Sequence, residues 1–252
     1  VSAHADLDEP IAKLARQARR RPLTQPEFLR LMALLSTQRM ICNGMALLEF
    51  DEIWPTLQPP TTYTERQAAR LSSPKLRELR ALVEELVIDQ GRKVVIFSQW
   101  RRMLQLAAWA VEDALRAAGL RSAFFTGAES QARRTSHIVA FHDEPDMRLL
   151  LLTDAGGVGL NLQRAATACI NLELPWNPAV LEQRIGRVHR LGQTSPIDVY
   201  NLVSEAGIES RIADVVGAKQ ALFRGLFDGE TNEIRFEDAD TVMSKLERLI
   251  EA

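Results

Sequence analysis

Three arginines recur at every third position near residue 187, as Arg184, Arg187 and Arg190. Residues spaced three apart lie close together on one face of a helix, so the spacing predicts a basic stripe on a helix over residues 179–189. Phosphoryl transfer needs fixed cationic donors where negative charge develops on the γ-phosphate. The stripe could supply them, although a basic patch on a solvated surface would show the same spacing.

A glycine-rich segment precedes these arginines at a distance that favours the phosphate interpretation. Residues 151–162 read LLTDAGGVGLNL, which predicts a strand, a polar edge and a turn. Glycines permit close backbone approach, and their free N–H groups can hold an anion. No lysine follows as in a phosphate-binding P-loop, so on its own the segment indicates only a tight strand-to-helix turn.

Short apolar runs alternate with amphipathic ones across residues 73–217. The predicted strands span residues 94–97, 122–125, 149–153, 168–174 and 198–202. The predicted helices span residues 74–87, 103–118, 128–141 and 179–189. Such alternation indicates an α/β domain, a parallel sheet with helices on both faces, where ligands gather at the carboxyl ends of the strands.

The flanking segments are predicted to be mainly helical. Residues 1–72 carry apolar residues at helical spacing, and the prolines within 53–64 indicate a connector. Helices are also expected over residues 209–227 and 239–250, so that a helical tail occupies 218–252.

An apolar run ending in Asp51-Glu52 imitates the acidic strand that binds magnesium in P-loop enzymes. Only 46 residues precede the run, and the whole chain contains no GxxxxGK[ST] segment and no Gly-Lys pair. We therefore expect a helical turn or linker there, with both carboxylates solvated.

The composition is that of an ordinary globular protein, with 252 residues, 46% hydrophobic and 25% charged. A net charge of -2 excludes a uniformly basic DNA-coating protein but allows a local basic groove. The two cysteines, Cys42 and Cys169, form no CxxC pair, which favours a reducing compartment. We expect no metal site, because no CxxC pair accompanies His137 and His142. We also expect no association with membranes, since no 18-residue apolar stretch occurs. The chain begins with valine, so we expect it to be a piece of a longer protein.

Seven segments together resemble, in order, the SWI/SNF-type branch of the superfamily 2 helicases and translocases. They are a Ser-x-Lys-Leu lead-in (73–76), motif IV (93–100), an Asp-Gly…Arg…Phe stretch (126–141), motif V (153–162), an Asp-Trp-Asn-Pro signature (174–178), motif VI (183–193) and the closing segment (199–212). The sequence departs from the family pattern at Thr126, where an Asp is usual, and before Trp176, where the Asp is absent. The resemblance covers about residues 73–213.

The resemblance implies one of two RecA-like lobes with ATP between them. The first lobe carries the P-loop and the magnesium ligands, so ATP and Mg²⁺ would be bound mainly there. Arg187 and Arg190 would be arginine fingers. The other residues implied on the nucleotide side are Gln183, Arg184, Asp154, Gly157 and Gly159. The implied nucleic-acid contacts are Ser98, Gln99, Thr126, Thr153, Asn161 and Trp176, although Trp176 could equally be a buried anchor. A further nucleic-acid contact is expected at Arg101, because it follows motif IV at the carboxyl end of a predicted strand.

We therefore expect the second motor lobe of a double-stranded DNA translocase, inactive as an ATPase on its own, monomeric, and partnered by the N-terminal lobe. The location would be intracellular, in the cytoplasm or nucleoid, and the compact linker hints at a prokaryote. Two alternatives remain: a lobe of an RNA or strand-separating helicase, and a non-catalytic binding scaffold. The intact arginine triplet argues against the scaffold.

Overall fold

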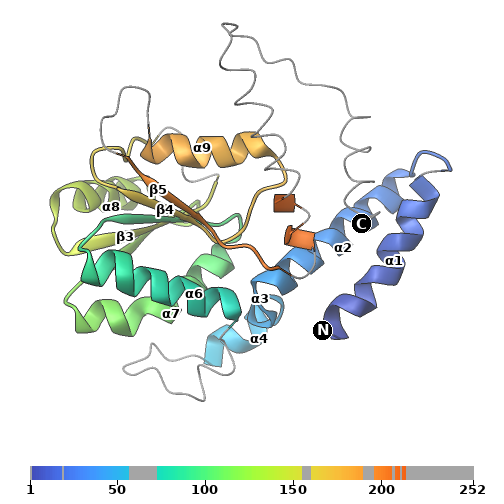
Figure 1. Ribbon diagram of the computed structural model, residues 1–252, viewed down its shortest axis with the longest axis horizontal. Helices are drawn as coiled ribbons and strands as arrows, with labels where there is room; N and C mark the ends of the chain where they lie inside the picture. Colours follow the sequence, from blue (N-terminus) through green and yellow to red (C-terminus); the bar gives the residue numbers. More distant parts are fainter. Residues whose placement is uncertain are drawn as a thin grey trace, which may run out of the picture. The chain divides into compact units, whose positions relative to one another are not determined.

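A computed structural model describes residues 2–18, 20–56, 73–154, 160–189, 196–205, 208–210 and 212–213. The chain forms two compact units (Figure 1). Unit 1 combines residues 1–42 with 204–252, and unit 2 spans residues 43–203. The predicted helix over 209–227 lies largely outside the described residues, and the one over 239–250 lies entirely outside them.

Unit 2 is built on a five-stranded, all-parallel sheet in the order β2-β3-β1-β4-β5. The strands are β1 (Val94–Phe97), β2 (Arg121–Phe125), β3 (Met147–Leu152), β4 (Ala168–Asn171) and β5 (Asp198–Asn201). The central strand β1 pairs with β3 from Val94 opposite Leu149 and with β4 from Val94 opposite Ala168. All four residues of β1 are buried, as expected for a strand covered on both faces.

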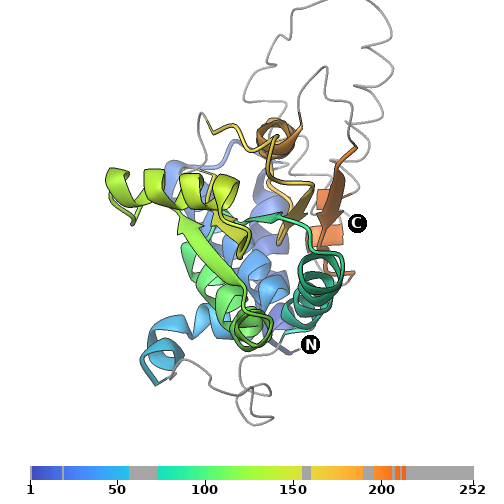
Figure 2. The ribbon, with the colours of Figure 1, turned by 90° about the vertical axis from the view of Figure 1, so that its left-hand side faces the viewer.

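Helices cover both faces of this sheet, as Figure 1 shows and the rotated view of Figure 2 repeats. One face carries α6 (Pro74–Val83), continued by the π-helical turn η2 (Glu84–Asp89), and α7 (Arg101–Ala117). The other face carries α8 (Gln131–Asp143) and α9 (Pro178–Val188). The predicted α/β fold with helices on both faces is therefore confirmed.

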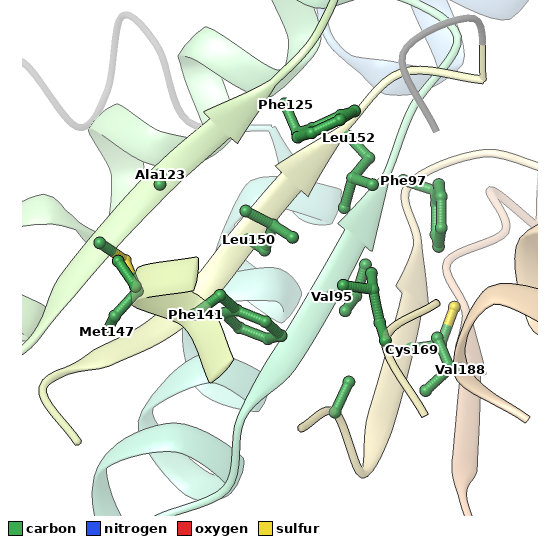
Figure 3. Packing of buried hydrophobic residues seen from close by; sticks show 13 residues of the cluster. Val95, Phe97, Ala123, Phe125, Phe141, Met147, Leu150, Leu152, Cys169 and Val188 are labelled. Carbon is green, nitrogen blue, oxygen red and sulfur yellow. The ribbon is translucent and has the colours of Figure 1, made fainter. Parts of the chain in front are cut away.

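The core between the sheet and α8/α9 is a continuous apolar cluster (Figure 3). Alternate residues of the strands point into it, among them Val95 and Phe97 of β1 and Leu150 and Leu152 of β3. Helix α8 contributes Phe141, which is fully buried. This packing fixes the strand ends against the two helices.

Unit 2 begins with short helical pieces: α3 (Met45–Leu48), α4 (Phe50–Ile53) and the 3-10 turn η1 (Trp54–Thr56). Asp51 and Glu52 lie exposed on α4, and Asp51 accepts a hydrogen bond from Arg102 at 2.8 Å. The prediction of a helical turn with solvated carboxylates, rather than a magnesium strand, is confirmed.

Unit 1 contains the helices α1 (Ser2–Ala18) and α2 (Gln25–Asn43). Glu27 fixes the start of α2 by accepting hydrogen bonds from the Thr24 backbone N–H at 2.9 Å and from Arg21. Within the described ranges, no helix is long and apolar enough to span a membrane.

Candidate functional site

The site lies where the carboxyl ends of β1 and β4 adjoin. From β1 the chain passes through α7 to β2, on one side of the sheet, and from β4 it passes through α9 to β5, on the other side. The connections from β1 and from β4 thus lead to opposite sides of the sheet. Open parallel sheets bind their ligands at such a switch point, which here lies between β1 and β4. Ser98 follows β1, Glu173 follows β4, and α9 begins five residues after Glu173.

Arg184 of α9 lies buried at this point, with 2% of its surface exposed. Its Nε and Nη2 donate to the two oxygens of Asp154 at 2.6 and 2.9 Å. Its Nη1 donates to the Glu173 carbonyl at 3.0 Å and to Asn171 Oδ1 at 3.2 Å, and Nη2 lies 3.5 Å from Glu173 Oε1. The guanidinium therefore joins the strand ends of β3 and β4 to α9.

Burial and charge oppose each other in this cluster. Burial disfavours the charge of Arg184, but its hydrogen bonds to Asp154 and the field of Glu173 outweigh burial, so the pKa of Arg184 is raised. Complete burial raises the pKa of Glu173 above its ordinary value, against the positive field of Arg184. Arg184 therefore stays charged, and it is held by the buried Glu173 and Asn171 and by the partly exposed Asp154.

Arg187, three residues further along α9, has a different environment. It is partly exposed, and no hydrogen bond or ion pair joins its guanidinium to any other residue that the structure describes. Its backbone carbonyl accepts a hydrogen bond from Leu162 N at 2.9 Å, which brings the end of the glycine-rich segment to the last turn of α9. The two segments singled out in the sequence are thus adjacent.

The predicted stripe of three arginines on one helix needs correction. Helix α9 ends at Val188, and Arg190 lies beyond it, outside the described residues. Of the two arginines that the structure describes, Arg184 faces inward and Arg187 is partly exposed, because α9 turns its Arg184 side toward the polar ends of β3 and β4. Gly157 and Gly159 also fall outside the described residues, and Gln183 is exposed.

The Trp-Asn-Pro signature sets the start of α9. The Asn177 side chain caps the helix by accepting the Ala179 N–H at 3.0 Å, and Pro178 occupies the first turn. Trp176, directly before the cap, is partly exposed. The signature thereby fixes the position from which Arg184 and Arg187 extend.

The residues expected to contact nucleic acid fall into two groups. Gln99 and Trp176 are partly exposed, and Arg101 and Asn161 are exposed. Ser98 and Thr126 are fully buried, and Thr153 is 9% exposed. The hydroxyls of Ser98 and Thr126 donate inward, at 2.9 Å to Glu173 and at 2.7 Å to Glu129, respectively.

Glu173 and Glu129 are therefore site residues that the sequence reasoning missed. The available signal was a single Glu within the apolar run NLELP, which predicts a strand over 168–174. The strand instead ends at Asn171, because the chain turns there to direct Glu173 at the end of β1.

Comparison with known proteins agrees with this geometry. Residues 75–192 match the helicase conserved C-terminal domain. The chain is 29% identical over 216 residues to the uncharacterized ATP-dependent helicase YqhH of Bacillus subtilis, covering 81% of this chain and 36% of YqhH. It is 37% identical over 165 residues to the DNA repair protein RAD5 of Cryptococcus neoformans, covering 64% of this chain and 13% of RAD5. The chain thus spans about a third or less of these relatives.

Solved structures share the fold. The Sulfolobus solfataricus SWI2/SNF2 ATPase core in complex with dsDNA superimposes with a TM-score of 0.65 at 23% identity, covering 98% of this chain and 45% of that one. The C-terminal part of the Fun30 ATPase domain gives a TM-score of 0.61 at 18% identity, covering 98% of this chain and 92% of that one.

The parallel sheet, with its arginine helix at the switch point, defines a RecA-like lobe. Residues 75–192 carry the helicase conserved C-terminal domain, and the relatives and solved structures support an assignment to the SWI/SNF-type branch of the superfamily 2 helicases.

Proposed function

We propose that this chain is the second motor lobe of an ATP-dependent double-stranded DNA translocase and that it does not turn over ATP by itself. In this proposal Arg187 and Arg190 reach ATP that is bound mainly by an N-terminal RecA-like lobe. The motor works inside the cell, as one copy of each lobe, on the phosphate backbone of a DNA duplex.

The observation that carries the proposal is the contrast between Arg184 and Arg187. Arg184 is saturated by Asp154, Asn171 and Glu173 inside the lobe. Arg187 is partly exposed, with no side-chain partner among the residues that the structure describes. A guanidinium that is held on a capped helix, with no side-chain partner in the described part of the chain, suits a group that arrives from outside, such as a γ-phosphate.

The described side chains near α9 fit the phosphate side of ATP but not a magnesium site. Of the nearby carboxylates, Asp154 and Glu173 are both paired with Arg184. Mg²⁺ prefers carboxylate oxygens that are free to enter an octahedral shell. We therefore assign Mg²⁺ and the phosphate cradle to the first lobe, where the ion would neutralise phosphate charge.

Arginine fingers on a separate lobe act only when the two lobes close. Their hydrogen bonds are then stronger in the transition state than in the ground state, which lowers the barrier to hydrolysis. Closure and reopening would move one lobe along the duplex. Gln99, Arg101 and Asn161, exposed or partly exposed at strand and loop ends, offer contacts to phosphate, which carry no sequence information.

The deciding experiment measures ATP hydrolysis by this chain alone, by the P-loop lobe alone, and by the mixture, with and without duplex DNA. We expect no turnover from this chain alone and DNA-stimulated turnover from the mixture. Turnover by this chain alone, or no stimulation of the mixture, would refute the proposal. A strand-displacement assay on the same mixture tests the helicase alternative, because a translocase moves along a duplex without separating its strands.

A further inference from the structure

A buried carboxylate fastens the turn that follows β1. Ser98 Oγ donates to Glu173 Oε2 at 2.9 Å and accepts the Trp100 backbone N–H at 3.1 Å. The Gln99 backbone N–H donates to Glu173 Oε1 at 2.6 Å. Both oxygens of one carboxylate therefore hold the turn at residues 98–100, called the β1 turn below.

The turn after β2 is fastened in the same way by a different carboxylate. Thr126 donates its hydroxyl and its backbone N–H to Glu129 Oε2 at 2.7 and 2.6 Å, and its hydroxyl accepts the Ala128 N–H at 3.2 Å. Glu129 also lies 3.9 Å from Arg101 at the start of α7. The two turns thus share one local design: a hydroxyl that accepts a backbone N–H two residues on and donates to an acid.

The two acids differ in their contacts beyond the turn that each one holds. Glu173 is fully buried, its side chain is 3.5 Å from Arg184 Nη2, and its carbonyl accepts from Arg184 Nη1 at 3.0 Å. A second buried cation, Lys75, donates to the neighbouring Leu172 carbonyl at 2.8 Å. Glu129 has no such link to α9. Asp154 also joins a strand end to α9, because it follows β3 and pairs with Arg184. Among the described residues, Glu173 is the acid that bonds the β1 turn and also contacts Arg184.

We propose that Glu173 is a positioning residue that couples the β1 turn to α9, so that DNA on the exposed part of this turn sets the placement of Arg187. The inference deepens the proposed function and rests on it.

The physical basis is the rigidity of the connection. The carboxylate is fully buried between the hydrogen bonds of the turn and Arg184, so it cannot follow one partner without disturbing the other. Packed interiors have little free volume and shift between discrete arrangements rather than deforming gradually. A displacement of the Gln99 backbone would therefore pass through the carboxylate and Arg184 to Arg187, three residues along the same helix.

The test compares Glu173→Gln with the matched control Glu129→Gln, each in the whole chain combined with the P-loop lobe. ATP turnover is measured across a range of duplex DNA concentrations. For Glu173→Gln we expect DNA-saturated turnover to fall about 10-fold toward the DNA-free rate, in the usual range of coupling between sites. The readout is the ratio of DNA-saturated to DNA-free turnover, which should fall by about the same factor. For Glu129→Gln we expect a higher DNA concentration at half-stimulation, with saturated turnover retained.

A merely structural role for Glu173 would lower DNA-free and DNA-saturated turnover equally, and that result would overturn the inference, as would normal stimulation. Because Glu173→Gln alters a fully buried carboxyl group and could unfold the chain, Ser98→Ala serves as a second variant. It removes one link to the β1 turn and leaves the contacts between Glu173 and Arg184 in place. We expect a loss of saturated turnover from it, and full saturated turnover would contradict the coupling. Failure of the unmodified mixture to respond to DNA would instead refute the proposed function.

Discussion

Arg184 and Arg187 lie three residues apart on α9, and the difference between their surroundings decides what the loss of each should do. The sequence placed both on one helix near phosphate chemistry. It could not separate them, because the inward side of α9 depends on contacts with Asp154 and Glu173, which lie 30 and 11 residues away along the chain.

Exchange of these two arginines for alanine should therefore affect different quantities. Arg187→Ala should lower DNA-stimulated ATP turnover by about 10³-fold, the usual effect of losing an arginine finger, and leave the unfolding midpoint unchanged. Arg184→Ala should lower the free energy of unfolding by about 3–5 kcal/mol, because Asp154 and Glu173 lose their buried partner. Turnover and urea denaturation of both variants check this. Normal turnover of Arg187→Ala, or an unchanged midpoint for Arg184→Ala, would contradict the assignment.

At the scale of elements, apolar alternation predicted the five strands and the four helices of the sheet domain, with differences at their ends. The β1 strand matches the prediction at both ends. Helix α8 begins at Gln131 rather than at residue 128, because Glu129 folds back onto Thr126 and Ser130 caps the helix by accepting the Arg133 N–H. Such ends depend on side-chain hydrogen bonds, which periodicity does not record.

Two glycines, one before a helix and one inside a helix, should change the stability of the chain in opposite directions when alanine replaces them. Gly44, before α3, has a φ of 142°, and an added Cβ would lie 2.8 Å from Cβ of Ser73, which caps α6. Gly44→Ala should therefore lower the free energy of unfolding by about 1–3 kcal/mol. Gly186 lies inside α9 with nothing within 4 Å of an added Cβ. Gly186→Ala should therefore raise the free energy of unfolding by about 0.5–1 kcal/mol.

Urea denaturation of this chain measures both changes in stability. For Gly186→Ala, ATP turnover of the mixed lobes is a second measurement. The P-loop lobe could need the space beside Gly186 in order to approach α9. In that case Gly186→Ala should lower the ATP turnover of the mixed lobes although it stabilises this chain. A Gly44→Ala variant as stable as the unmodified chain would mean that the turn before α3 adapts without moving the α6 cap.

For the whole molecule, the sequence predicted the class of fold and the order of motifs but not the buried polar cluster. Glu173 and Glu129 become site residues only when β1, β2 and β4 end at one edge of the sheet. The charges also act collectively. Burial alone would raise the pKa of Asp113 and of Glu129, but hydrogen bonds from Arg80 and Thr126, respectively, outweigh it and lower both pKa values.

The stability of the chain should therefore decrease in acid. A carboxyl whose pKa is lower in the folded state stabilises the fold above its unfolded pKa, near 4, and this contribution disappears as the pH falls through the folded pKa. The free energy of unfolding should decline below about pH 4. Urea denaturation at a series of pH values measures it. Glu129→Gln should make the decline shallower, and Glu78→Gln, which changes an exposed acid on α6, is the matched control. Identical pH profiles for all three proteins would show that Glu129 makes no such contribution.

The net charge of -2 sets how this lobe should bind DNA by itself. Among the described residues, few exposed cations follow the strands, Arg101 and Arg102 after β1 among them, so only a few phosphates can be neutralised. For about three phosphates, counterion release predicts that affinity falls roughly 40-fold between 50 and 200 mM salt. Arg101→Ala should reduce the slope of log affinity against log salt by about one. Fluorescence anisotropy with a labelled duplex measures both slopes. An affinity that does not change with salt would place the binding on uncharged contacts, whereas a much steeper slope would require cations from outside the strand ends.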